Sequence, residues 1–168
     1  MKNKTTIRIA NIDDLPFIVD IYNQAIRSKS ATGDMNEFTV DERIIWFNKF
    51  DADKYPLYVA QQNDKVVGYA TLSPYRAGRQ AMSKIAEISF FVDNFFQRMG
   101  IGSALVKHAI SDCKRLGKDN LLAILLDINP DSISLLKKFN FEEWGRLPDV
   151  IDFGKFRCDH LIYGLNLK

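Results

Sequence analysis

The residues best suited to chemistry lie in a short turn that contains two glycines. Residues 95–105 read FFQRMGIGSAL, so Gln97 and Arg98 precede Gly100 and Gly102, between a very apolar run and an amphipathic one. A strand that ends in such a turn and leads into a helix leaves several backbone N–H groups unpaired at the positive end of the helix dipole. Glycine lets oxygens approach these groups closely, so the sequence predicts a turn that binds phosphate or diphosphate.

Two well-known phosphate-binding loops do not fit this turn. A P-loop needs GxxxxGK followed by Ser or Thr, and the chain contains no such run. The dinucleotide fingerprint GxGxxG would place a third glycine at Leu105, and that fingerprint belongs to a leading βαβ unit. The remaining pattern is Gln/Arg-x-x-Gly-x-Gly/Ala, which residues 97–102 match.

Seven strands are predicted to surround the turn. Alternating or uninterrupted apolar residues indicate strands at 6–10, 57–61, 66–73, 85–92, 121–128, 141–150 and 156–166. The Asn63–Lys65 segment is typical of a hairpin turn. Residues 90–92 are apolar without a break, which favours a central strand covered on both faces.

Four helices are predicted from capping residues and apolar spacing. Asp13 and Asp14 open the first helix, and Pro16 fits only its first turn. A capping box at 39–42 starts a second helix, which is expected to bury Ile44 or Ile45 together with Phe47 and to run to about residue 50.

The other two helices flank the strand at 121–128. The third carries an apolar stripe over residues 105–116 that Gly117 can end. The fourth begins with Asn129 as the cap and Pro130 at the first helical position, and it runs to Phe139, where Asn140 can close it in the left-handed conformation. The order of elements predicts a mixed α/β (α+β) domain of three layers.

Composition limits the class of protein. The 168 residues are 46% hydrophobic, fit one domain spanning 1–168, and carry a net charge of only +2. This balance gives no electrostatic case for nucleic acid or a membrane surface, so a small-molecule partner is expected. Cys113 and Cys158 are the only cysteines, with no metal-type spacing and no signal-peptide pattern, so we expect a cytoplasmic protein without a metal site.

The glycine turn and a later motif resemble the GCN5-related N-acetyltransferase (GNAT) superfamily. An apolar strand with an acid precedes the turn and a helix follows it, and residues 129–132 (NPDS) match the Asn-x-x-Ser of that superfamily. A narrower resemblance, to the phosphinothricin and methionine sulfoximine acetyltransferases, covers nearly the whole chain. It is carried by the segments 7–8, 13–16, 21–23, 42–43, 46–47, 55–57, 68–70, 75–77, 87–89, 145–148 and 153–156.

The resemblance implies the GNAT acyl-CoA N-acyltransferase fold, with a mostly antiparallel sheet flanked by helices. It also implies acetyl-CoA as co-substrate and a homodimer. An alkyl amine has a pKa of about 10.4, so exposing its lone pair at pH 7 costs about 4.6 kcal/mol and calls for a base. The resemblance places the catalytic Glu at Glu87, where partial burial would raise its pKa toward the operating pH.

The resemblance also assigns residues to acetyl-CoA. The strand after Glu87 is expected to splay, so that the backbone of residues 90–92 binds the pantetheine arm and the acetyl oxygen. The residues expected to bind the cofactor are Phe90, Phe91, Val92, Gln97, Arg98, Met99, Gly100, Ile101, Gly102, Ser103, Asn129, Ser132 and Lys138. Lys138 could equally be part of a solvated helix end.

For the acceptor, the resemblance places Arg76 at an acidic group of the substrate and Tyr75 at the pocket wall. Leu136 occupies the position where many members of the superfamily have a Tyr general acid, which leaves the acid unassigned. His108 is expected to face solvent, and His160 could line the acceptor pocket.

The hypothesis is therefore an enzyme that transfers acetyl from acetyl-CoA to the amino group of a small amino-acid-like acceptor by direct attack in a ternary complex. One alternative is another amine: a polyamine, an antibiotic or a peptide N-terminus. The other is a domain that binds acyl-CoA without turnover. Glu87 and Arg76 favour the enzyme, whereas Leu136 slightly favours the binding module.

Overall fold

The computed structural model describes residues 4–168 and contains one seven-stranded sheet in the order β1-β2-β3-β4-β5-β7-β6. Only β4 and β5 are parallel; every other pair of neighbours is antiparallel within the described residues. The strands are β1 (Thr6–Ile9), β2 (Leu57–Gln62), β3 (Lys65–Pro74), β4 (Ile85–Val92), β5 (Asn120–Leu126), β6 (Glu142–Asp152) and β7 (Arg157–Asn166). The predicted mixed, mostly antiparallel sheet is confirmed.

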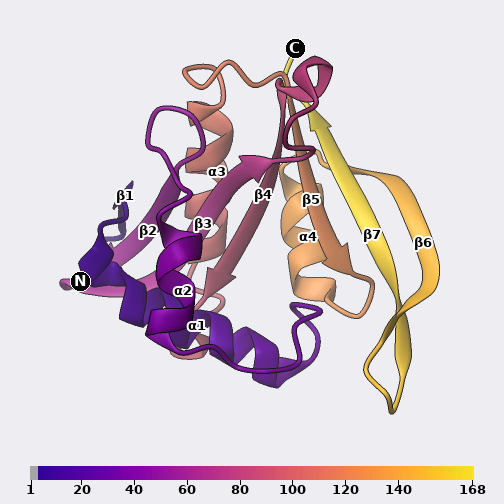
Figure 1. Cartoon of the computed structure of the whole chain (residues 1–168), viewed down its shortest axis with the longest axis horizontal. Helices are drawn as coiled ribbons and strands as arrows, with labels where there is room; N and C mark the ends of the chain where they lie inside the picture. Colours follow the sequence, from indigo (N-terminus) through magenta and orange to yellow (C-terminus); the bar gives the residue numbers. More distant parts are fainter. Residues whose placement is uncertain (1–3) are drawn as a thin grey trace.

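In the described residues, four α-helices cover the sheet, two on each face (Figure 1). They are α1 (Leu15–Ser28), α2 (Val40–Phe47), α3 (Ile101–Asp112) and α4 (Pro130–Lys138). Strand residues alternate between faces. Tyr58 therefore packs in the core beneath α3 and α4, whereas Val59 packs in the core beneath α1 and α2. The predicted three layers are confirmed, and no helix of the described chain is long and apolar enough to cross a membrane.

Local capping chemistry is confirmed at three predicted places. The Asn129 side chain accepts a hydrogen bond from Ser132 N–H at 3.2 Å and begins α4. Thr39 and Glu42 form the reciprocal capping box that begins α2. Asn140 closes α4 with a φ of 63°. These contacts fix where two of the helices that border the functional site begin.

Predictions for the second and third helices need correction. Helix α2 ends at Phe47 rather than near residue 50, and Ile45 is 75% exposed. Ile44 is also exposed and Phe47 only half-buried, because α2 packs on α1 and its outer side faces solvent. Helix α3 ends at Asp112, before Gly117, which takes the left-handed conformation in the turn that follows.

The central strands β4 and β5 diverge (Figure 1). Their pairing covers only Ile85–Glu87 against Asn120–Leu122. Strand β4 is central and covered on both faces as predicted, with Phe90 and Val92 packed on the core beneath α3 and Phe91 on the core beneath α1. Its second half lacks a paired strand on the β5 side, and Phe90, Phe91 and Val92 are only half-buried. The divergence opens the sheet at its centre, directly before the glycine turn.

Candidate active site

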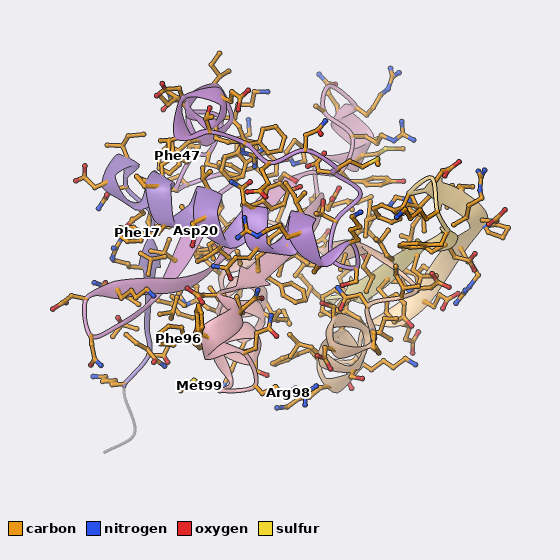
Figure 2. All side chains as sticks on the ribbon, turned by 90° about the horizontal axis from the view of Figure 1, so that it is seen from below. Phe17, Asp20, Phe47, Phe96, Arg98 and Met99 are labelled. Atoms are coloured by element: carbon orange, nitrogen blue, oxygen red, sulfur yellow. The ribbon has the colours of Figure 1, made fainter. Side chains whose placement is uncertain are left out.

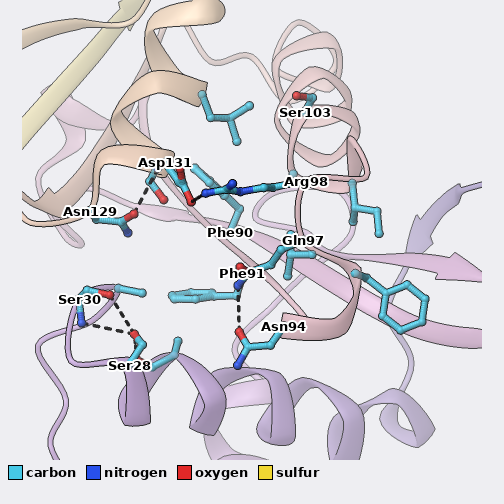
Figure 3. Close-up of a pocket in the computed structure, with 18 of the residues that line it drawn as sticks. Ser28, Ser30, Phe90, Phe91, Asn94, Gln97, Arg98, Ser103, Asn129 and Asp131 are labelled. Carbon is cyan, nitrogen blue, oxygen red and sulfur yellow. Dashed lines mark hydrogen bonds and ion pairs between the residues drawn. The ribbon is translucent and has the colours of Figure 1, made fainter.

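A groove of about 490 Å³ lies where β4 and β5 diverge (Figure 3). The end of β4, the glycine turn, the first turns of α3 and α4, and the loop after α1 form its walls. Eleven of the thirteen predicted cofactor residues line it: Phe90, Phe91, Val92, Gln97, Arg98, Gly100, Ile101, Gly102, Ser103, Asn129 and Ser132. The sequence did not reveal the rest of the lining, which is Ala25, Ser28, Ser30, Ala31, Asn94, Phe96, Asp131 and Leu135.

Two helix N-termini meet in this groove. Gly100 caps α3 in the left-handed conformation, with a φ of 85°, and Asn129 caps α4. A Cβ atom on Gly102 would lie 3.1 Å from Leu135 Cδ2 and 3.7 Å from Val92 Cγ2, so this glycine keeps open the space between two groove walls. The positive ends of two helix dipoles and a cradle without side chains suit the phosphates of acetyl-CoA.

An ion pair spans the outer edge of the groove. Arg98 Nη2 lies 3.6 Å from Asp131 Oδ2, and both side chains are strongly exposed (Figure 3). Figure 2 shows Arg98 and Met99 at the edge of the molecule. Because an exposed pair of this kind is weak, Arg98 can exchange its carboxylate partner for a phosphate at little cost.

Two predicted cofactor residues lie outside the groove lining. Met99 is 56% exposed and precedes the turn's first glycine. Lys138 is exposed at the last position of α4, eight residues after Pro130 and therefore about 12 Å along the helix axis from the groove.

The backbone register of β4 decides which amides are free. Asp93 N–H donates to Val67 C=O, and β3 and β4 are antiparallel, so alternation directs the backbone groups of Phe91 toward β3 as well. Those of Phe90 and Val92 point toward β5, where strand pairing has already ended. Phe90 and Val92 can therefore offer backbone groups to a ligand, whereas Phe91 contributes its side chain.

A second cavity of about 420 Å³ adjoins the groove, and Ala31 and Phe91 line both. Glu87 and Ser89 line the second cavity beside Ser73 and Thr71, their cross-strand partners on β3. Burial raises the pKa of the Glu87 carboxyl above its ordinary value. No described side chain forms an ion pair with this carboxylate, which remains free to accept a proton from a molecule in the cavity.

The opposite wall of the second cavity comes from α1, α2 and the loop between them. Arg43 lies with its guanidinium carbon 3.8 Å from the ring centre of Trp46. Burial, together with a hydrogen bond to Asp34, raises the pKa of Tyr22 to about 12, so its hydroxyl stays neutral. A role for Arg43 was not predicted. Arg43 lies three residues before Trp46 and therefore on the same helix face, and this spacing could have indicated a contact between the two side chains.

The other predicted residues lie as follows. Tyr75 and Arg76 follow β3 and line neither cavity; Arg76 is exposed, 5.7 Å over the Tyr75 ring. Leu136 is 1% exposed in the core beneath α3 and α4, so it faces neither cavity. His108 is exposed as predicted, and His160 lines the second cavity.

Comparisons with known proteins agree with this geometry. The model of the Acetyltransferase (GNAT) family matches residues 18–141. YwnH of Bacillus subtilis, named as a candidate phosphinothricin acetyltransferase, is 34% identical over 97% of this chain and 99% of its own. An L-methionine sulfoximine/L-methionine sulfone acetyltransferase of Salmonella typhimurium is 29% identical over 90% of this chain and 88% of its own.

A solved structure supports the same assignment. YncA of Salmonella typhimurium, determined with its cofactor acetyl-CoA, superposes with a TM-score of 0.92 at 27% identity, covering 98% of this chain and 95% of that one. The family match, these relatives and a groove that fits acetyl-CoA agree: the chain belongs to the GNAT acetyltransferase family and is an N-acetyltransferase that uses acetyl-CoA.

Proposed function

We propose that the protein acetylates the α-amino group of a small amino-acid-like acceptor of the phosphinothricin or methionine sulfoximine type. The observation that carries this proposal is the pair of adjoining cavities, with Glu87 in the second one. The groove suits the phosphates and pantetheine arm of acetyl-CoA, and the second cavity has the size of a small acceptor. The names of two relatives point to the same acceptor class.

Glu87 acts as the general base, directly or through a water molecule. Its raised pKa brings it closer to that of the ammonium group that it must deprotonate, which is the condition for efficient proton transfer. The N–H groups of Phe90 and Val92 face the opening beside β5, where they stabilise the oxyanion that develops on the acetyl carbonyl. One such donor is worth about 3–4 kcal/mol.

The acetyl group passes directly from the thioester to the amine in a ternary complex. Neither cysteine lines a cavity in the described chain, and both are buried. Burial, with the nearby Asp112 carboxylate, raises the pKa of Cys113 to about 12, which makes this thiol a poor nucleophile for an acyl-enzyme route. The leaving thiolate needs little protonation, since a thiol has a pKa of about 8.5, so the route does not require an acid at Leu136.

We infer a homodimer from the subfamily resemblance, and a cytoplasmic location from the two unpaired cysteines and the sequence pattern. The edge strand β6 exposes Trp144, Leu147 and Val150 to a potential partner. Light scattering of the purified protein tests the dimer.

The test of the proposed function is a thiol-release assay with acetyl-CoA and a panel of amines, with mass spectrometry of the products. We expect N-acetylation of methionine sulfoximine, methionine sulfone or phosphinothricin, and intersecting lines in double-reciprocal plots. Transfer only to spermidine or to a peptide N-terminus would contradict the proposed acceptor class and assign the enzyme to that other amine. Binding of CoA without turnover of any amine would favour a non-catalytic module.

A further inference from the structure

Among the residues that line the second cavity, Arg43 is the one Lys or Arg and Glu87 is the one Asp or Glu. We propose that Arg43 binds the carboxylate of an amino-acid acceptor, and that this contact makes the enzyme prefer amino acids over amines that lack a carboxylate. This inference rests on the proposed function, and it names the residue that recognises the substrate class.

The guanidinium of Arg43 is held by aromatic rings and not by acids. Its central carbon lies 3.8 Å from the ring centre of Trp46, 4.9 Å from that of Phe38 and 5.1 Å from that of Tyr22. Contacts of this kind use the face of the guanidinium and leave its in-plane N–H groups available for a carboxylate. A planar fork of donors matches the two oxygens of a carboxylate.

Arg43 differs in this respect from most arginines of the described chain. Six others form ion pairs with acidic side chains: Arg8, Arg27, Arg98, Arg115, Arg146 and Arg157. Arg76 and Arg79 form none, but both are exposed on the loop after β3 and line neither cavity. Arg43 is the one that combines a half-buried position in a cavity with no acidic partner.

The surrounding loop holds Arg43 in place before a ligand arrives. The Asn23 side chain donates to Phe38 C=O at 2.8 Å and accepts from Phe38 N–H at 2.9 Å, which ties α1 to the start of α2. Asp34, the nearby acid, accepts a hydrogen bond from the Tyr22 hydroxyl and forms no ion pair with Arg43. A preorganised guanidinium loses little entropy when it binds its anion.

Arg76, which the resemblance places at an acidic group of the acceptor, lies exposed over Tyr75 and lines neither cavity. Arg79 lies exposed on the same loop, lines neither cavity and has no predicted role. Arg43 and Arg79 therefore form a matched pair for mutagenesis, one inside the cavity and one outside it.

The experiment compares methionine sulfone with its carboxamide as acceptors, using wild type, Arg43→Met, Arg43→Lys and Arg79→Met. Wild type should prefer the acid. Arg43→Met should lower kcat/KM for the acid roughly 10- to 100-fold, the usual worth of a charge-assisted contact, and leave the carboxamide nearly unchanged. Arg43→Lys keeps the charge without the planar fork, so it should restore part of the preference. Arg79→Met should keep all of it.

A preference for the acid that survives in Arg43→Met, or that disappears in Arg79→Met, would overturn the proposal. Calorimetric titration of each acceptor into CoA-loaded protein gives the same comparison without turnover, and thermal melting shows whether each variant is folded. Transfer to both acceptors with no preference in wild type would refute the role of Arg43 while sparing acetyl transfer. Failure of wild type to acetylate any amino acid would instead refute the proposed acceptor class.

Discussion

Replacing Gly102 with alanine should separate cofactor binding from folding. The added methyl would point between Leu135 and Val92, two walls of the groove, at 3.1 Å and 3.7 Å from their nearest methyl carbons. The closer contact is with the end of a flexible side chain, which can move by a few tenths of an ångström. Alanine also favours a helix over glycine by about 0.5–1 kcal/mol, so the free energy of unfolding should change by less than about 1 kcal/mol.

The effect on cofactor binding should be much larger. A methyl in this cradle keeps the phosphate oxygens from the backbone N–H groups, and losing one charge-assisted hydrogen bond costs about 1.5–3 kcal/mol. The Kd for CoA should therefore rise about 10- to 100-fold. Isothermal titration calorimetry and thermal melting on the same protein preparation measure the two quantities.

Gly145→Ala is the matched control for this experiment. Its Cβ would meet Ile162 at ordinary distances of 3.7 Å and 3.8 Å, and Gly145 lines neither cavity. The control should bind CoA like wild type. If folded Gly102→Ala also binds CoA with the wild-type Kd, the reasoning that places phosphate against this glycine is wrong.

Three further predictions concern charges. Asp131→Asn frees Arg98 for phosphate, so calorimetry at low salt should show a Kd for CoA that is lower by about 1.4- to 5-fold. An unchanged or higher Kd would contradict this. Burial raises the pKa of Glu87, so ionisation of this carboxyl opposes folding as pH rises through that pKa. Glu87→Gln should leave the melting temperature at pH 7 unchanged or higher. A clear decrease would show that ionised Glu87 stabilises the fold and would refute this reasoning. Burial alone would raise the pKa of Asp14, but hydrogen bonds from Arg8 and from Asn11 N–H lower it, so the stability that ionised Asp14 contributes is lost as pH falls below about 3.8. Asp14→Asn should therefore lower the free energy of unfolding by about 1–2 kcal/mol at pH 7 in urea titrations. An equal loss at pH 7 and pH 2 would contradict this linkage.

Features set by local chemistry could be predicted from the sequence. The caps at Asn129 and Thr39 and the left-handed Asn140 depend on residues within four positions, and all three are present. The glycine turn was found in the same way, because its residue types and spacing are themselves the signal.

Features set by packing between distant segments could not be predicted. Either Ile44 or Ile45 was expected to be buried, yet both are exposed because no element of the described residues covers the outer side of α2. Arg43 was assigned no role, since its position in the second cavity depends on how α2 lies over β3 and β4. Arg76 lines neither cavity, and the acceptor contact that the family pattern implies for it stays a prediction.

The role of Glu87 is tested most directly by steady-state kinetics of Glu87→Gln with methionine sulfoximine at saturating acetyl-CoA. General-base catalysis contributes about 10²- to 10⁴-fold to the rate, so kcat should fall by that factor. The Kd for acetyl-CoA should stay within about twofold of the wild-type value, because Glu87 lies in the second cavity and not in the groove. A kcat equal to that of wild type would contradict the account of how this cavity performs acetyl transfer.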